Sequence, residues 1–182
     1  DAETTWTLDN TDGELTVHTG VAGPAAKMGH RLTLLMASWR ITTRWTDGTP
    51  VGGDLTVDVD SLQVQRGDGG VTPLTGPEKA VARGNALKTL DAKRFPTIEF
   101  QTAAITASDD GYLLSGVLSI HGVTRPQDIT LTVTDTGTAR ELSCTADVRQ
   151  SDFGIKAFSM MLGAMKVDDN VTVSFRARHA RA

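Results

Sequence analysis

The sequence has one cysteine, few aromatic residues and no long apolar run, and each scarcity narrows what the chain can be. Cys144 has no second cysteine to pair with, so no intrachain disulfide can form. Aromatic residues make up 5% of the chain, so a core has to be built largely from Val, Leu and Ile. A membrane-spanning helix needs about 18 or more consecutive apolar residues, and no such run is present. The sequence therefore predicts no stable membrane insertion.

Neither sign of charge is in large excess. The 18 basic and 22 acidic residues are interspersed and give a formal net charge of −4. Nucleic-acid binding usually needs a basic stripe, so no nucleic-acid partner is expected. A basic cluster near the C-terminus is interpreted as a solvated tail; it consists of Arg176, Arg178, His179 and Arg181. This charge pattern predicts no membrane-docking patch, so delivery to a membrane would need transient contact or a partner.

Residues that carry chemistry form no recognisable catalytic motif. The four histidines are not spaced as metal ligands, so no metal and no other cofactor is expected. No nucleophile elbow, zinc-protease motif or carboxylate pair is present. The glycine-rich stretch 66–76 lacks the Lys-Ser/Thr of a phosphate loop. The sequence therefore favours binding over catalysis.

What the sequence does have is alternation of apolar and polar residues. Three consecutive runs show it, at 97–101, 112–120 and 129–133, and period two is typical of strands with two different faces. Short turns at 108–111 and 122–126 separate the runs. Because proline cannot donate to a ladder, we expect Pro126 at or before the start of the third strand. The pattern predicts an antiparallel meander whose apolar face is covered by a second sheet or by closure into a barrel.

The remaining chain adds further strands and one helix. Strands are predicted at 4–8, 14–19, 53–65, 139–150 and 170–177, and the stretch 31–45 is either one long bent strand or two short ones. The stretches 21–30 and 151–167 are interpreted as irregular. A helix is predicted at 77–91, with an apolar stripe of Ala80, Val81, Leu87 and Leu90 and with Lys79, Arg83 and Lys88 outside. The sequence thus predicts one all-β domain over residues 1–182, with about eight to nine strands.

Three local features suggest roles. The segment with Met160, Met161, Leu162 and Met165 is interpreted as a plug closing one barrel end or as an adaptable lip around an apolar ligand. Arg149 and Asp152, with Phe153 beside them, suggest an ion pair at the barrel rim; the alternative is that Arg149 meets a polar or phosphorylated ligand head. Cys144 lies in an alternating run and is expected to be a small buried residue rather than a reactive thiol.

Several motifs together resemble the YceI-like family, also called polyisoprenoid-binding proteins. They are TWTLD at 5–9, VDVDSLQV at 57–64, LDAKRFPTIEF at 90–100, the spacing of Gly116, Leu118, Ile120, Gly122, Thr124 and Pro126 within 111–133, and VRQSDFGIK at 148–156. The chain departs from the family at 83–87, where Arg-Gly-Asn-Ala-Leu replaces an Arg-Asp pair before His-Leu. The stretch before Ser38 also departs, although His30 corresponds to a family histidine.

The resemblance implies a lipocalin-like, eight-stranded antiparallel β-barrel with one helix packed at an opening. It also implies an elongated internal pocket for a long isoprenoid chain or a related amphiphilic lipid, which would be the partner of the protein. Burial of apolar area would hold such a ligand, without a precise polar constellation. The candidate ligand-binding residues are Trp39, Val57, Leu87, Phe100, Leu114, Leu118, Leu131, Arg149, Phe153, Met160 and Met161.

Alternatives stay open at this point. The barrel could be an enzyme acting on a lipid or quinone, with His30, His121 or Arg149 as the polar group, or a scaffold for an interaction or stress-response protein. A homodimer is expected if a sheet edge stays open. No signal peptide is visible, which slightly favours the cytoplasm; because the chain begins at Asp1, removal of a leader and a periplasmic or secreted location is the alternative.

Overall fold

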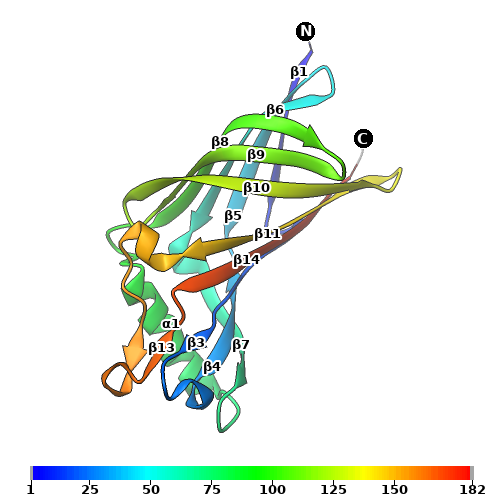
Figure 1. Ribbon diagram of the computed structural model, residues 1–182. Coiled ribbons are helices and arrows are strands. Elements are labelled where there is room, and N and C mark those ends of the chain that lie inside the picture. Colours follow the sequence, from blue (N-terminus) through cyan, green and yellow to red (C-terminus); the bar gives the residue numbers. More distant parts are fainter. Residues whose placement is uncertain (1, 181–182) are drawn as a thin grey trace.

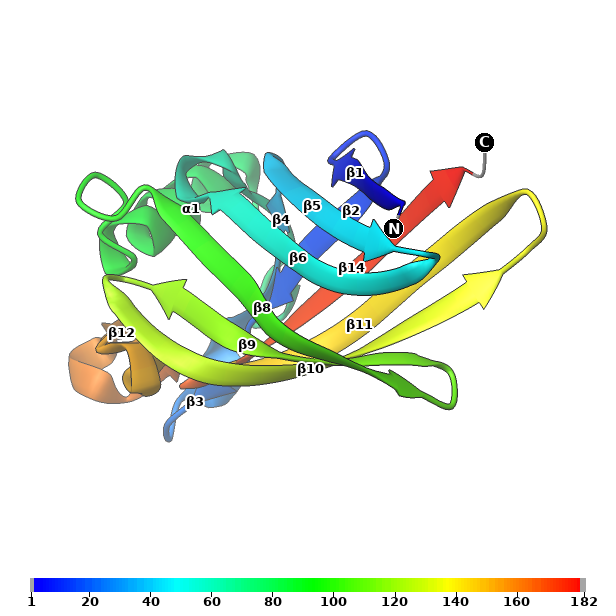
Figure 2. The same ribbon diagram turned by 90° about the horizontal axis from the view of Figure 1, so that it is seen from above.

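One large antiparallel sheet curls around an apolar interior in the computed structural model, which describes residues 2–180 (Figures 1 and 2). In spatial order its strands are β1 (Glu3–Asp9), β5 (Trp39–Thr46), β6 (Thr49–Asp58), β8 (Thr97–Ser108), β9 (Gly111–Ile120), β10 (Val123–Asp135), β11 (Ala139–Arg149), β14 (Asn170–Ala180), β2 (Gly13–His18), β4 (His30–Met36) and β7 (Leu62–Gly69). A second, small sheet contains β12 (Ser159–Met160), β13 (Met165–Val167) and β3 (Val21–Ala22). The α-helix is α1 (Gly76–Thr89), and single 3₁₀ turns are η1 (Ala26–Met28), η2 (Val59–Ser61), η3 (Gln150–Phe153) and η4 (Met161–Gly163).

The large sheet has eleven strands, so the expected number of eight is wrong, and a bend in the chain accounts for much of the difference. β4 and β5 are separated only by residues 37–38, and β6 and β7 only by η2. β5 pairs with β6, while β4 pairs with β7 at the other end of the strand order. The four strands are therefore one long hairpin, bent at a corner. The predicted single strand at 53–65 is wrong for this reason, and the alternative of two strands within 31–45 is confirmed.

The predicted meander is confirmed as β8, β9 and β10. Phe100 lies opposite Leu118, and Leu114 lies opposite Ile129, so the apolar residues of three strands share one face. The β9–β10 turn is formed by His121 and Gly122, both at positive φ (55° and 75°). This two-residue geometry suits a tight hairpin.

The expected position of Pro126 is wrong, because it lies inside β10, opposite Val117. β10 pairs with β11 only from Thr132 to Asp135. At Pro126 the edge of β10 that faces away from β9 carries no ladder, and a proline is tolerated at such an unpaired edge.

The interior is packed in two clusters of buried apolar side chains. The larger contains Leu8, Leu15, Leu34, Met36, Trp39, Val57, Leu62, Leu142, Phe175 and Ala177. The smaller contains Phe100, Leu118, Ile120, Val148, Phe153 and Ile155. Trp39 meets Phe175 edge to face, with 5.4 Å between the ring centroids, so the cluster joins strands from both sides of the curl.

Helix α1 begins with a complete capping box. The Thr75 hydroxyl accepts from the Glu78 N–H at 3.3 Å, and the Glu78 carboxylate accepts from the Thr75 N–H at 3.2 Å. The hydrogen bond with Thr75 lowers the pKa of Glu78. The expected apolar stripe is wrong at its first two residues, since Ala80 and Val81 are exposed. The other two predicted residues, Leu87 and Leu90, do pack against the larger cluster, and Ala86 joins them.

No helix among residues 2–180 combines the length and the hydropathy needed to cross a bilayer.

Replacing the capping threonine tests how the helix begins. Thr75→Ala leaves the Glu78 N–H without its side-chain acceptor, and we expect the free energy of unfolding to fall by about 1 kcal/mol. Urea unfolding followed by circular dichroism measures the change. Thr72→Ala, in the same loop, is the control, because no side-chain hydrogen bond of Thr72 is found within residues 2–180; its effect should stay within about 0.5 kcal/mol. Equal effects would contradict the capping role.

Candidate functional site

The inner face of the curled sheet is one continuous apolar surface. From strand to strand, Leu55 lies opposite Phe100, Leu114 opposite Ile129, and Ala146 opposite Val173. The residues between them alternate outward, as the sequence pattern predicts. The curl therefore concentrates apolar side chains where a ligand could lie.

Many side chains on this inner face are only half-buried. These residues pack against the two clusters and still keep part of their surface accessible; they are Leu55, Ile98, Leu114, Ile129, Leu131, Val133, Val171 and Val173. Side chains that fill a core to native density are fully buried, as in the two clusters. The space enclosed by the curl is thus not completely filled by the side chains that face it.

A mouth opens at the end of the curl that holds the termini. There a hollow of about 530 Å³ lies between the β8–β9 and β10–β11 turns. Its lining includes Tyr112 and Val133 from the inner face, with Trp45 and Arg140. This hollow connects the inner face with solvent.

A stack of rings crosses this mouth. Trp6 of β1 lies between Trp45 (5.5 Å) and His179 (4.0 Å), measured between ring centroids. The Arg140 guanidinium lies 4.8 Å from the centre of the Trp45 ring. Burial, and then the positive charge of Arg140, lower the pKa of His179. His179 is therefore largely uncharged at neutral pH. The stack joins β1 to β14.

The interpretation of the C-terminal basic cluster as a solvated tail is wrong for its described residues. Arg176, Arg178 and His179 belong to β14 and pair in register with β11. Arg181 lies outside the described residues. The strand predicted at 170–177 therefore continues to Ala180; charged residues fit within it because only alternate residues of a strand face the interior.

The outer face carries a second hollow of different character, with a volume of about 660 Å³. Its lining is rich in hydroxyl groups from five strands: Thr16, Thr33, Thr130, Thr132, Ser143, Thr145 and Ser174. Glu14 and Arg176 also line it, 3.8 Å apart. Hydroxyl and charged side chains thus line much of the outer hollow, in contrast to the apolar inner face.

Cys144 lies on the inner face, half-buried and directly opposite Phe175. Burial raises the pKa of its thiol to about 11, from an ordinary value of 9.0. A thiol in this setting behaves as a small apolar side chain, as the alternating pattern predicts.

Alkylation tests the position of Cys144. The raised pKa reduces the thiolate fraction at pH 8 about a hundredfold, so we expect iodoacetamide to modify the native thiol at least about a hundredfold more slowly than the urea-unfolded one. Intact-mass spectrometry over time measures both rates. Thr145→Cys in a Cys144→Ala background is the matched control, since Thr145 is exposed on the opposite face; it should react like a free thiol. Rapid native labelling of Cys144 would contradict an inward position.

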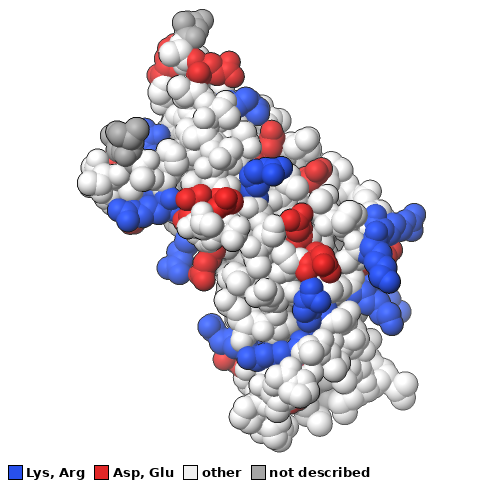
Figure 3. Space-filling view, turned by 180° about the vertical axis from the view of Figure 1, so that it is seen from behind, with Lys and Arg blue, Asp and Glu red and all other residues white. Residues whose placement is uncertain are grey.

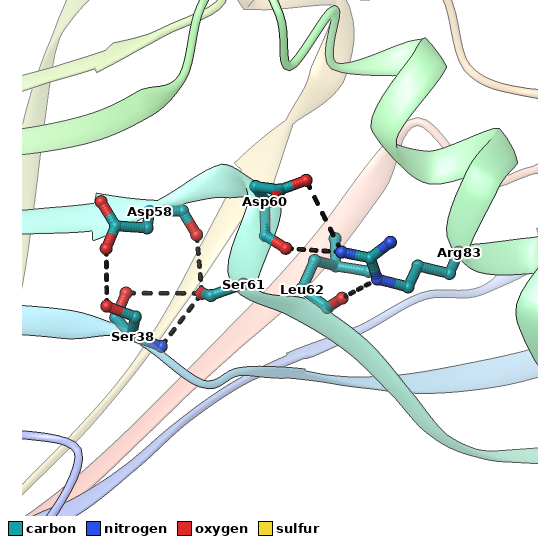
Figure 4. Close-up of polar contacts among 6 residues, drawn as sticks. All are labelled: Ser38, Asp58, Asp60, Ser61, Leu62 and Arg83. Carbon is teal, nitrogen blue, oxygen red and sulfur yellow. Dashed lines mark hydrogen bonds and ion pairs between the residues drawn. The ribbon is translucent and has the colours of Figure 1, made fainter.

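At the bend of the long hairpin, a small polar cluster holds the corner (Figure 4). The Ser61 hydroxyl donates to the Asp58 carbonyl at 2.6 Å and accepts from the Ser38 N–H at 3.0 Å. The Ser38 hydroxyl donates to the Asp58 carboxylate at 2.6 Å. Short side chains that bond nearby backbone compete with the ladder and favour a turn, which explains why the strand predicted at 53–65 divides here.

Helix α1 is tied to the same corner by Arg83 (Figure 4). Its Nε donates to the Leu62 carbonyl at 2.7 Å and its Nη2 to the Asp60 carbonyl at 2.6 Å. The Asp60 carboxylate is 3.6 Å from Nη2. The prediction that Arg83 points outward is therefore wrong. The helix pattern could not reveal these contacts, since the acceptors of Arg83 lie more than twenty residues away in the sequence.

Removing the guanidinium tests this anchor. Arg83→Met keeps the aliphatic stem but leaves two backbone carbonyls without donors, and we expect the free energy of unfolding to fall by about 1–2 kcal/mol, because water partly replaces the lost donors. Lys88→Met removes a charge from an exposed position of the same helix and should change it by less than about 0.5 kcal/mol. Urea titrations of the unaltered protein and the two variants measure the change in the free energy of unfolding. A loss for Arg83→Met no larger than for Lys88→Met would show that the anchor is not needed.

The structure separates the sequence-predicted site residues into groups. Leu114 and Leu131 are half-buried on the inner face, and Leu87 reaches the larger cluster from α1. Five others are buried within the packed clusters: Trp39, Val57, Phe100, Leu118 and Phe153. Met160 and Met161 are exposed. They lie on the surface and do not fill the interior as a plug would, and their role as a lip around a ligand stays a prediction.

Arg149 is exposed at the end of β11. No ion pair between Arg149 and Asp152 is found among residues 2–180, so the predicted rim pair is not formed. Instead, the Asp152 carbonyl accepts from Arg125 Nε at 2.9 Å. Asp152 therefore meets Arg125 rather than Arg149, its neighbour in the sequence, because the turn η3 packs against β10.

The polar groups named for an enzyme are held apart by separate contacts. His30 Nε2 donates to the Thr72 carbonyl at 2.7 Å, and His121 Nδ1 lies 3.3 Å from the Phe153 carbonyl oxygen. Within the described part of the chain, no hydrogen bond or ring contact joins any two of His30, His121 and Arg149. Among residues 2–180, no group of three or more His, Cys, Asp or Glu side chains is placed to hold a metal ion.

One buried donor on the inner face lacks an acceptor. Trp39 is 3% exposed, and its indole N–H has no hydrogen-bond partner within residues 2–180. Leaving a buried donor unpaired is unfavourable. The Trp39 N–H is therefore an unpaired donor inside the larger cluster.

Comparison with known proteins gives the fold a family. The profile of the YceI-like domain matches residues 6–179. BcnA from Burkholderia cenocepacia superposes with a TM-score of 0.72 at 16% identity, over 94% of this chain and 98% of BcnA. A mutant YCEI protein of Campylobacter jejuni with a monobromobimane guest gives 0.61 at 12% identity, over 82% and 84%. The Campylobacter jejuni YCEI protein in another crystal gives 0.53 at 13% identity, over 73% and 74%. No curated protein matches the chain.

Proposed function

Because the chain belongs to the YceI-like family, we propose that it binds a long-chain isoprenoid or a related amphiphilic lipid, of polyprenyl or quinone type. The lipid lies along the inner face of the curled sheet, and the protein acts as its carrier or store without chemistry. Proteins of this family are in general binding proteins rather than enzymes.

The observation that carries the proposal is the half-buried state of the inner face. Leu114, Ile129, Leu131 and Val133 point into the curl from adjacent strands and keep accessible apolar surface. Covering such surface contributes about 25 cal/mol for each Å² removed from water. A flexible hydrocarbon chain can follow this surface from β9 to β14 without needing polar partners.

One further feature supports a ligand with one polar end. The mouth hollow offers Arg140 and Tyr112 beside solvent, where a head group would stay hydrated. This feature favours an amphiphile over a plain hydrocarbon.

A pair of neighbouring leucines provides a matched test. Leu114 points inward and is half-buried, whereas Leu113 is 38% exposed on the other face. Leu114→Trp should occupy the unfilled space, and we expect the Kd for a fluorescently labelled long-chain polyprenol to rise at least about tenfold. Leu113→Trp should leave the Kd unchanged. Fluorescence titration measures both.

The same two variants also report whether space exists. Inserting a larger side chain into a filled core costs about 1–3 kcal/mol. If the inner face is unfilled, Leu114→Trp costs less than about 1 kcal/mol of unfolding free energy while it weakens binding. A strongly destabilised Leu114→Trp, together with no polyprenol binding by the unaltered protein, would reject the proposal.

A further inference from the structure

Exposed apolar side chains gather at the end of the molecule away from the termini. Three separate loops contribute them: Met28 (51% exposed), Val71 (78%), and Met160, Met161 and Leu162 (50%, 51% and 109%). We call these five residues the apolar tip. Figure 1 shows the loops around η1, β7 and β13 side by side at the bottom of the view. Scattered exposed apolar residues are ordinary, but clustered ones mark an interaction surface.

Specific contacts hold the three loops together. In the small sheet Met160 lies opposite Met165, and Lys166 lies opposite Ala22. The Ala25 N–H donates to the Ala164 carbonyl at 2.8 Å. The loop with Val71 is fastened by His30, whose Nε2 donates to the Thr72 carbonyl at 2.7 Å. The apolar tip is thus built by the fold.

The backbone of the apolar tip adopts an unfavourable conformation at Met161 and Leu162. Met161, Leu162 and Gly163 all have positive φ (54°, 55° and 88°). Residues other than glycine rarely adopt this left-handed region, and such strain is found chiefly where a segment has a role. Here it leaves Leu162 fully in solvent.

Charge is distributed unequally between the two ends. The segments 21–29, 69–77 and 156–167 contain the exposed residues Lys27, Lys156 and Lys166, and acidic residues occur only directly beside the segments, at Asp68, Glu78 and Asp168. The turns at the opposite end carry Asp47, Asp109, Asp110 and Asp135. In Figure 3 the bottom of the molecule is largely uncharged, with basic side chains above it, and acidic side chains lie at the top.

We propose that the apolar tip is a docking surface for an anionic lipid bilayer. Leu162 and the methionines enter the interfacial region, the three lysines lie against lipid phosphates, and the acidic end faces away from the membrane. A protein partner would need a pocket for each of three protruding loops, whereas a bilayer accepts them in any arrangement.

This docking does not rest on the identity of the internal ligand. α1 lies at the same half of the molecule as the apolar tip (Figure 1), so docking would bring the helix end of the curled sheet to the bilayer. Docking and internal binding are measured separately.

Flotation with vesicles tests the apolar contribution. We expect the protein to float with vesicles of phosphatidylcholine and phosphatidylglycerol, and much less with phosphatidylcholine alone. Met161→Glu and Leu162→Glu should each lower the bound fraction at least about tenfold. Val51→Glu is the matched control, because Val51 is 52% exposed near the opposite end; it should bind like the unaltered protein. Absence of flotation, or equal loss for Val51→Glu, would overturn the proposal.

Charge reversal tests the lysines. Lys27→Glu, Lys156→Glu and Lys166→Glu should each weaken binding to the anionic vesicles by at least about fivefold, and added salt should reproduce the loss. Arg178→Glu makes the same charge change on β14 and should have little effect. If instead the unaltered protein sediments as a dimer that Leu162→Glu dissociates, and no variant floats, the apolar tip is a protein interface and the proposal fails. Polyprenol binding by the tip variants should stay unchanged, so a failure of docking is distinguishable from a failure of internal binding.

Discussion

The corner at Ser38 and Ser61 is the constraint on which the rest of the structure depends. The Asp58 N–H donates to the Ser38 carbonyl at 3.0 Å and the Ala37 N–H to the Ser61 carbonyl at 3.3 Å, so the two strands of the hairpin turn together. One half of the hairpin then lies at each end of the strand order, which obliges the sheet to curl. Because the same turn supplies the acceptors for Arg83, the corner also determines where α1 sits.

The curl makes the two faces and the two ends of the molecule unlike. Alternation places apolar side chains on the inner face and hydroxyls on the outer one, so an apolar ligand and solvent are kept on opposite sides of a single layer. At one end a mouth is crossed by Trp6, Trp45 and His179. At the other end α1 and the apolar tip lie together. This polarity suits a protein that holds an amphiphile and meets a membrane with one end.

The sequence predicted local features well and long-range ones poorly. Alternation identified the meander and the inward position of Leu114, Leu131 and Cys144, because period two needs only neighbouring residues. The family resemblance, confirmed by the YceI-like profile, supplied the curled sheet, although its strand count was wrong. The helix stripe was misplaced because the acceptors of Arg83 lie on η2 and β7. The stack of Trp6 on His179 and the hydrogen bond from Ala25 to Ala164 could not be predicted, since each links segments more than a hundred residues apart.

The central claim is that the inner face holds a lipid. Native mass spectrometry after incubation with a long-chain polyprenol tests it most directly. We expect a complex with one lipid per chain, which solvent extraction releases as polyprenol and which Leu114→Trp forms only at a polyprenol concentration at least about tenfold higher. A spectrum showing only the unbound protein at saturating polyprenol, while the protein is folded by circular dichroism, would contradict it.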